Sequence, residues 1–266
     1  MKGVPCMTHE LIADLIQANA FELYGQPKWT FGKNTCNTYE VFAERVHLPG
    51  GSIVPARLLL ALIEQDAELT MLFSRWFLKA AIVSAAELSE RSRTHVTLSV
   101  NLLPQYASQP GFVEEVLALL ILTEFPARKL QFELSEAQNL TAQGIENLNR
   151  LHDEHGVGLY LANFGKGHAN IDLLSGVHFD GIELHRSFSA AIPGDDQMLR
   201  MICAVCNFAD TLNLKVCAKG IETPEQFDFF DQLKVFKGQG YLIGKPMAIA
   251  ELKEYIELYA VHVQED

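Results

Sequence analysis

Apolar residues follow two spacings along the chain. Short apolar runs, typical of buried strands, alternate with longer segments that have helical spacing. The runs predict strands at His95–Asn101, Lys129–Leu134, Gly158–Leu161, Phe179–Leu184, Leu214–Ala218 and Val235–Gln239. The segments between and after them predict helices at Gly111–Thr123, Leu140–His155, Asn170–Ser175, Gln197–Leu212, Pro224–Leu233 and Ile249–Tyr259.

The first part of the chain departs from this alternation. A helix is predicted at Glu10–Ala20, and two strands at Phe21–Gln26 and Thr38–Val46 flank a polar turn. Two helices follow, at Pro55–Gln65 and Glu68–Ser89.

Repeated strand-then-helix units with short connections predict a parallel sheet. With about eight strands, closure into a TIM-like (β/α)8 barrel is favoured over an open sheet. No linker, repeat or low-complexity tract interrupts the chain, so residues 1–266 are expected to form a single α/β barrel domain.

Composition and charge exclude several functions. The 266 residues are 48% hydrophobic, which is enough for one large core, and the formal net charge of −12 disfavours nucleic acid as a partner. Neither a signal peptide nor an uninterrupted apolar segment of membrane-spanning length is evident, so no membrane is expected and the location is predicted to be cytoplasmic.

Polar residues lie where the predicted strands end. In a parallel barrel these ends share one rim, where binding and catalytic residues gather. The residues are Asn101, Glu133, Asn163, Glu183, Lys219 and Gln239. Glu136 lies just beyond Glu133 and is expected at the same rim.

Short segments such as Gln26-Pro27, Val100–Leu102 and Gln239–Tyr241 stand in a fixed order along the chain. Together with the further segments given below, they resemble the EAL domain family of cyclic di-GMP phosphodiesterases. The resemblance covers about residues 23–256, and Glu40-Val41-Phe42 stands in the place of the signature Glu-Ala-Leu. It implies a mostly parallel barrel with one divergent N-terminal strand. The matching segments are Gln26-Pro27, Glu40–Phe42, Gly51–Pro55, Val100–Leu102, Phe132–Glu136, Ala162–Gly167, Glu183–Phe188, Ala218–Thr223, Gln239–Tyr241 and Gly244–Pro246.

The resemblance also implies a site for two Mg²⁺ or Mn²⁺ ions on the rim, with Glu40, Asn101 and Glu133 as retained ligands and Gln239 also kept. Other positions of this site have changed. Ala162 and Asn163 occupy the place of two aspartates, Glu183 that of a lysine, and Lys219 that of a glutamate.

These changes make two-metal binding improbable, because hard divalent cations depend on carboxylate ligands and a lysine in their shell repels them. No cofactor is therefore expected, and Mg²⁺ or Mn²⁺ only if residual phosphodiesterase activity survives. The exchanged signs at Glu183 and Lys219 predict an ion pair between them, with Lys219 also reaching Glu133 or Asn163.

Three functions remain open. The first is a non-catalytic EAL-like regulatory domain that binds another protein in bacterial signalling, such as control of motility, biofilm or transcription. The second is a receptor that binds cyclic di-GMP without cleaving it, with Gln26 and Arg186 as candidate nucleotide contacts. The third is a phosphodiesterase with weak residual activity. The protein partner is not identified by the sequence, and a homodimer is compatible with the resemblance.

Two histidines on a predicted helix, His152 and His155, lack a carboxylate pattern on that helix that would suit a metal. They are interpreted as ordinary surface residues.

Overall fold

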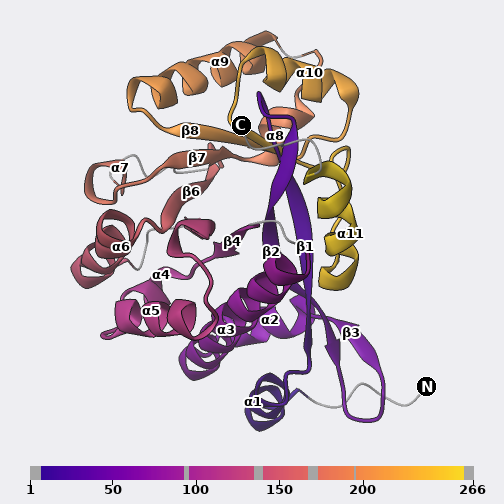
Figure 1. The fold of residues 1–266 in the computed structure, drawn as a ribbon, viewed down its shortest axis with the longest axis vertical. Coiled ribbons are helices and arrows are strands. Elements are labelled where there is room, and N and C mark those ends of the chain that lie inside the picture. The colour runs from indigo at the N-terminus through magenta and orange to yellow at the C-terminus, as the bar shows by residue number, and fades with distance from the viewer. Residues whose placement is uncertain (1–6, 93–95, 135–139, 167–172, 195, 261–266) are drawn as a thin grey trace.

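A closed barrel of eight strands forms the centre of the molecule (Figure 1). The computed structural model describes residues 7–92, 96–134, 140–166, 173–194 and 196–260. In their order around the barrel, the strands are β1 (Phe21–Thr30), β2 (Thr35–His47), β4 (Thr97–Asn101), β5 (Leu130–Leu134), β6 (Gly158–Phe164), β7 (Gly181–Leu184), β8 (Lys215–Lys219) and β9 (Lys237–Gln239).

Strand β1 runs opposite to both of its barrel neighbours, β2 and β9, whereas the pairs from β2 through β9 are parallel. The predicted divergent N-terminal strand is thereby confirmed. Two short strands extend the sheet outside the barrel. They are β3 (Ile53–Pro55), which pairs with β2, and β10 (Met247–Ala248), which pairs with β1.

Helices surround the barrel and connect its strands (Figure 1). The longer ones are α3 (Ala67–Ser92), α5 (Phe112–Leu122), α6 (Ala142–His155), α9 (Asp196–Thr211), α10 (Pro224–Gln232) and α11 (Ile249–Ala260). The shorter ones are α1 (His9–Gln17), α2 (Arg57–Ile63), α4 (Pro104–Ala107), α7 (Leu173–Gly176), α8 (Arg186–Ala190) and the 3₁₀ helix η1 (Ala127–Lys129).

The long helix α3 is, among the described residues, the one helix whose length and composition would also allow it to cross a membrane. In this structure, part of α3 packs into the hydrophobic core. Leu78, Ala81, Ile82 and Ala85 on one of its faces are buried and belong to the main apolar cluster. Its apolar character is therefore accounted for by packing against the barrel.

A second apolar cluster lies beside the barrel, where α1, α2 and the start of α3 pack on the outer ends of β1 and β2. Ile12 and Ile16 of α1 meet Phe21, Val46 and other buried residues there. This cluster packs on the end of the β1–β2 pair where β2 continues past the C-terminal end of the neighbouring strand β4 (Figure 1).

The observed strand β1 is longer than predicted, since it continues past Pro27 to Thr30. Proline lacks the N–H that a central strand needs. On the edge of β1 that faces away from β2, however, β1 pairs with β10 at Tyr24 and Gly25, and with β9 only from Trp29 onward. Pro27 lies in the gap between these partners, so its missing donor removes no ladder bond on that side.

Strands β3 and β10 and helices α4 and α8 were not among the predicted elements. Each is at most five residues long, too short to show a periodic pattern.

Candidate functional site

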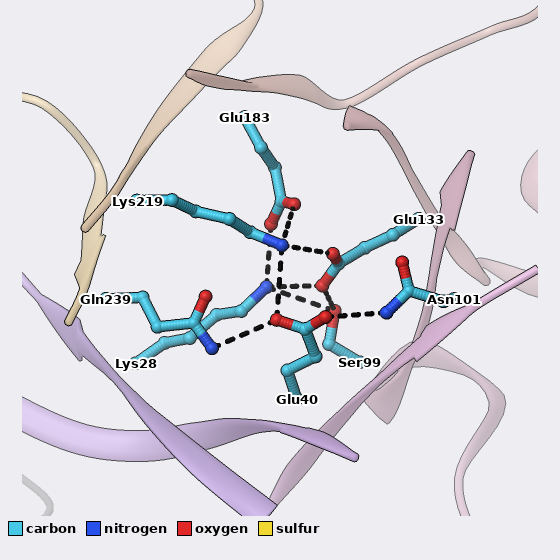
Figure 2. Close-up of polar contacts among 8 residues, drawn as sticks. All are labelled: Lys28, Glu40, Ser99, Asn101, Glu133, Glu183, Lys219 and Gln239. Atoms are coloured by element: carbon cyan, nitrogen blue, oxygen red, sulfur yellow. Dashed lines mark hydrogen bonds and ion pairs between the residues drawn. The ribbon is translucent and has the colours of Figure 1, made fainter. Parts of the chain in front are cut away.

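A cluster of charged and polar side chains fills the centre of the barrel near the ends of the parallel strands (Figure 2). Its members come from β1, β2, β4, β5, β7, β8 and β9, so nearly every wall of the barrel contributes. They are Lys28, Glu40, Ser99, Asn101, Glu133, Glu183, Lys219 and Gln239.

Lys219 joins three carboxylates. Its Nζ lies 2.7 Å from Glu183 Oε2, 2.7 Å from Glu133 Oε2 and 3.1 Å from Glu40 Oε2. The predicted ion pair between Glu183 and Lys219 is confirmed. Of the two further partners considered from the sequence, Glu133 is the one that Lys219 contacts.

Lys28 is a second lysine in the cluster, and sequence reasoning missed it. Its Nζ lies 2.5 Å from Glu133 Oε1, 2.7 Å from Glu183 Oε1 and 3.3 Å from Ser99 Oγ, and its side chain is 2% exposed. The other charged residues of the cluster lie on strands that run parallel, whereas Lys28 lies on β1, which is reversed. A signal was present, because Lys28 follows Gln26 by two positions and so shares its strand face.

The three carboxylates and two ammonium groups leave the cluster with a net charge of −1, whereas Glu40, Glu133 and Glu183 with Lys219 alone would leave it at −2. Burial opposes the charge of Glu133, but Lys219 and Lys28 together hold its pKa well below the ordinary value. Burial also opposes the charges of Lys28 and Lys219, yet the neighbouring glutamates raise both lysine pKa values, so both stay protonated.

Glu183 carries the remaining imbalance of the cluster. Burial, and then the charge of Glu133, raise its pKa from 4.5 to about 7, although Lys219 and Lys28 act against this. Since two ammonium groups cannot neutralise three carboxylates, one glutamate retains an affinity for a proton. Glu183, almost fully buried between its neighbours, is that residue.

Glu40 is held from three sides. Asn101 Nδ2 donates to its Oε1 at 2.6 Å, while Gln239 Nε2 donates to its Oε2 at 3.0 Å alongside the Lys219 contact. The sequence-predicted residues Glu40, Asn101, Glu133, Glu183, Lys219 and Gln239 are thus brought together in one network (Figure 2).

The Ala162–Asn163 pair lies within strand β6 rather than after it, in contrast to the predicted end of that strand at Leu161. The pairing with β7 is irregular between Leu161 and Phe164, and Asn163 has a positive φ of 57°. Asparagine tolerates this left-handed backbone better than most residues. Ala162 is 3% exposed and contributes only a methyl group, so this position offers no oxygen ligand.

A pocket of about 570 Å³ opens above the cluster. Gln26 and Arg186, the two candidate nucleotide contacts, both line it, as do Asn163, Lys166 and His185. The Gln26 amide nitrogen donates to the carbonyl oxygen of Gly244 at 3.0 Å. Glu40, Lys219 and Gln239 form its floor, and Glu136 lies outside the described residues.

Known proteins resemble this chain in sequence and in fold. It is 27% identical over 252 residues to the cyclic di-GMP phosphodiesterase NbdA of Pseudomonas aeruginosa. The aligned region covers 94% of this chain and 32% of NbdA. The chain spans less than half the length of this relative and of two others that it matches.

Solved structures agree on the fold. The EAL enzyme Bd1971, in its form bound to cAMP and cyclic di-GMP, superposes with a TM-score of 0.83 at 21% identity and covers 93% of this chain and 67% of its own. An EAL domain protein from Listeria monocytogenes superposes with a TM-score of 0.80 at 24% identity, over 96% of this chain and all of its own.

The sequence profile of the EAL domain matches residues 9–246, which is most of the chain. The chain therefore belongs to the EAL domain family.

Proposed function

We propose that this chain is a non-catalytic EAL domain, in which two lysine ammonium groups take the place of metal ions among the site carboxylates. The observation that carries the proposal is the pair of contacts on Glu133, with Lys28 on one carboxylate oxygen and Lys219 on the other. The metal-binding centre of the family would then be replaced by an internal ion network.

The donor set does not fit two Mg²⁺ or Mn²⁺ ions. These cations need several oxygen ligands, mostly carboxylates. All three glutamates of the cluster already contact a lysine within 3.1 Å, and Ala162 and Asn163 add no carboxylate. A metal ion would have to displace two ammonium groups that are tethered to the barrel wall.

The lysines also do not serve as a general base for water. A base must be unprotonated at the working pH. The pKa of Lys28 and that of Lys219 are both raised by the surrounding glutamates, so both amines hold their protons. Lys28 is buried below the floor of the pocket, away from any substrate in it.

With catalysis lost, we propose that the domain works by binding another protein in bacterial signalling. The EAL fold and the family relationship support a place in cyclic di-GMP signalling, and the acidic composition makes nucleic acid an unsuitable partner. A second copy of the chain could be this protein partner. Formation of such a homodimer would be measured as a doubled molar mass in solution.

A second candidate function is a cyclic di-GMP receptor, and the pocket is the observation that favours it. Lys166, Arg186 and Lys219 bring positive charge to its walls and floor, although Glu40 and Glu222 lie there as well. A ligand in this pocket would rest on the ion network without needing metal.

The test combines an activity assay with calorimetry. The purified chain is incubated with cyclic di-GMP and either Mn²⁺ or Mg²⁺, and linear product is measured by chromatography. We expect no product above a blank. Turnover that disappears in Glu40→Ala would overturn the non-catalytic proposal. Submicromolar binding of the nucleotide without turnover would favour the receptor, and its absence would leave protein recognition as the function.

A further inference from the structure

We propose that His152, Asp153 and His178 form a binding site for a divalent transition metal ion of the Zn²⁺ class. One ligand atom of each of these residues lies within 4.8 Å of the other two. His152 and Asp153 are near the C-terminal end of α6, and His178 precedes β7. The site is thus at the N-terminal ends of the parallel strands, opposite the charged cluster of the rim.

The carboxylate of Asp153 lies between the two imidazole rings. His152 Nδ1 is 2.8 Å from Asp153 Oδ1, and His178 Nδ1 is 2.9 Å from Asp153 Oδ2. In a tetrahedral zinc site with bonds of about 2.0–2.1 Å, neighbouring ligand atoms are separated by about 3.3 Å. For these groups to face one ion, the two Asp153 contacts would open by a few tenths of an ångström, and the two imidazole nitrogens, which lie within 4.8 Å of each other, would settle at about 3.3 Å.

A carboxylate also lies on the far side of the His152 ring, beyond hydrogen-bond distance at 3.6 Å but on the side where metal-binding histidines usually have a partner. Such a histidine presents one nitrogen to the metal and the other to a carboxylate, which fixes the ring. His152 Nε2 lies 3.6 Å from Asp180 Oδ2, while Nδ1 faces Asp153. Asp180 is itself fixed, because its Oδ2 accepts the backbone N–H of Leu159 in β6 at 3.0 Å.

The backbone of His178 is held in place by a single residue of α6. Asn149 Oδ1 accepts the backbone N–H of His178 at 2.9 Å, and Asn149 Nδ2 donates to the carbonyl oxygen of Gly176 at 2.8 Å. The segment that carries His178 is therefore tied to the helix that carries the other two ligands. Preorganisation of this kind lowers the cost of binding an ion.

The donor chemistry selects the class of metal. Two imidazole nitrogens and one carboxylate suit Zn²⁺, Ni²⁺ or Cu²⁺, whereas Mg²⁺ and Ca²⁺ prefer sites made of oxygen alone. Three protein ligands leave a fourth position for water, and the side chains of Asp153 and His178 are about half exposed, which gives an ion access.

The interpretation of His152 as an ordinary surface residue, made because its helix shows no suitable carboxylate pattern, is therefore replaced by this proposal. The carboxylate comes from its immediate neighbour in the chain, Asp153, and the second imidazole comes from a different segment. His155, the other histidine of the pair, contacts Glu154 at 3.9 Å and is not among the three ligands.

The test measures Zn²⁺ affinity of the tag-free chain in competition with a chromophoric chelator. We expect one Zn²⁺ per chain in wild type and a loss of affinity of at least tenfold in His178→Gln and in Asp153→Asn. Asp180→Asn removes the negative charge that faces the His152 ring but keeps an oxygen that can accept the Leu159 N–H, and it should weaken binding roughly 10- to 100-fold. Circular dichroism melts without zinc check that each variant is folded.

His9→Gln is the matched control, because His9 is also a partly exposed histidine, 2.8 Å from the carboxylate of Asp66, but has no second imidazole. Its zinc affinity should equal that of wild type. The proposal is overturned if wild type takes up no Zn²⁺, or if His178→Gln and Asp153→Asn bind it as tightly as wild type does. Loss in His9→Gln equal to that in His178→Gln would also overturn it, as the uptake would then be nonspecific.

Discussion

Lys28 and Glu133 form an ion pair across the barrel, with Nζ and Oε1 2.5 Å apart and both side chains at most 2% exposed. Their strands, β1 and β5, are not neighbours, because β2 and β4 lie between them. The contact therefore joins separate walls of the barrel, and it is made by a residue outside the set of strand ends where such sites are usually sought.

Removing the Lys28 ammonium should destabilise the fold. In Lys28→Met, Lys219 alone would face Glu40, Glu133 and Glu183, and loss of one partner from a buried ion pair typically costs about 3–5 kcal/mol. We expect a decrease of this order in the free energy of unfolding, measured by urea denaturation. Lys33→Met, in the exposed turn between β1 and β2, is the control and should have little effect.

The same prediction can be sharpened with a second substitution. Glu183→Gln in the Lys28→Met background removes one of the carboxylates left without a counter-ion, so part of the lost stability should return. Strict additivity of the two single effects would show that Lys28 and Glu183 are not coupled, which the 2.7 Å contact between them does not allow.

Making the cluster more negative, from −1 to −4, should give it affinity for a hard cation. In the double variant Lys28→Ile, Lys219→Glu, both ammonium groups are removed and four carboxylates converge on the barrel centre. We expect Mn²⁺ binding by calorimetry in the micromolar to millimolar range and none in wild type. Lys219→Gln alone serves as a comparison, since it removes a cation without adding a carboxylate.

Stability should depend on pH through Glu183. Its folded-state pKa of about 7 lies above the ordinary value of 4.5. The folded chain therefore binds this proton more tightly, and the resulting stabilisation is present below about pH 4.5 and lost as the pH rises through 7. We expect the free energy of unfolding of wild type to fall relative to that of Glu183→Gln between about pH 5 and 8, and parallel urea-derived profiles would contradict this.

The backbone at Asn163 gives a local prediction. Its φ of 57° is unfavourable for a residue with a β-carbon, by about 1–2 kcal/mol, and asparagine and glycine bear this best. Asn163→Ala should lower the free energy of unfolding by about 1 kcal/mol, while Asn163→Gly should change it little. Asn207→Ala, at an exposed position of helix α9, is the control for loss of the amide and should be neutral or slightly stabilising.

The alternation of strands and helices could be predicted because strands such as β5 and β6 are largely buried apolar runs and helices such as α6 bury one apolar face. The ends of some strands were harder to predict from the sequence. Strand β1 extends past Pro27 only because the sheet happens to leave that position without an outer partner, which is a property of the closed barrel. Strand β6 extends through Asn163 only because its pairing with β7 is irregular there.

Part of the candidate site could likewise be predicted from the sequence, and part could not. Glu183 and Lys219 could be paired from the sequence, because adjacent parallel strands carry them at the same rim and their charges are opposite. Lys28 could be placed only by combining the expected divergent direction of β1 with its spacing of two positions from Gln26. The Asp153 site could not be found from one helix, since His178 belongs to another segment. Contacts between distant segments depend on the closed fold, which a local pattern does not specify.

The reversed direction of β1 has a consequence for how the ligand positions of this barrel are read from the sequence. This chain retains Glu40, Asn101, Glu133 and Gln239. It also carries Lys28, which contacts Glu133 from β1, a strand that runs opposite to its barrel neighbours. An inventory of ligand positions alone would then leave out a cation that already contacts Glu133 and Glu183. The residue two places after the opening glutamine of β1 should be read alongside the ligands themselves.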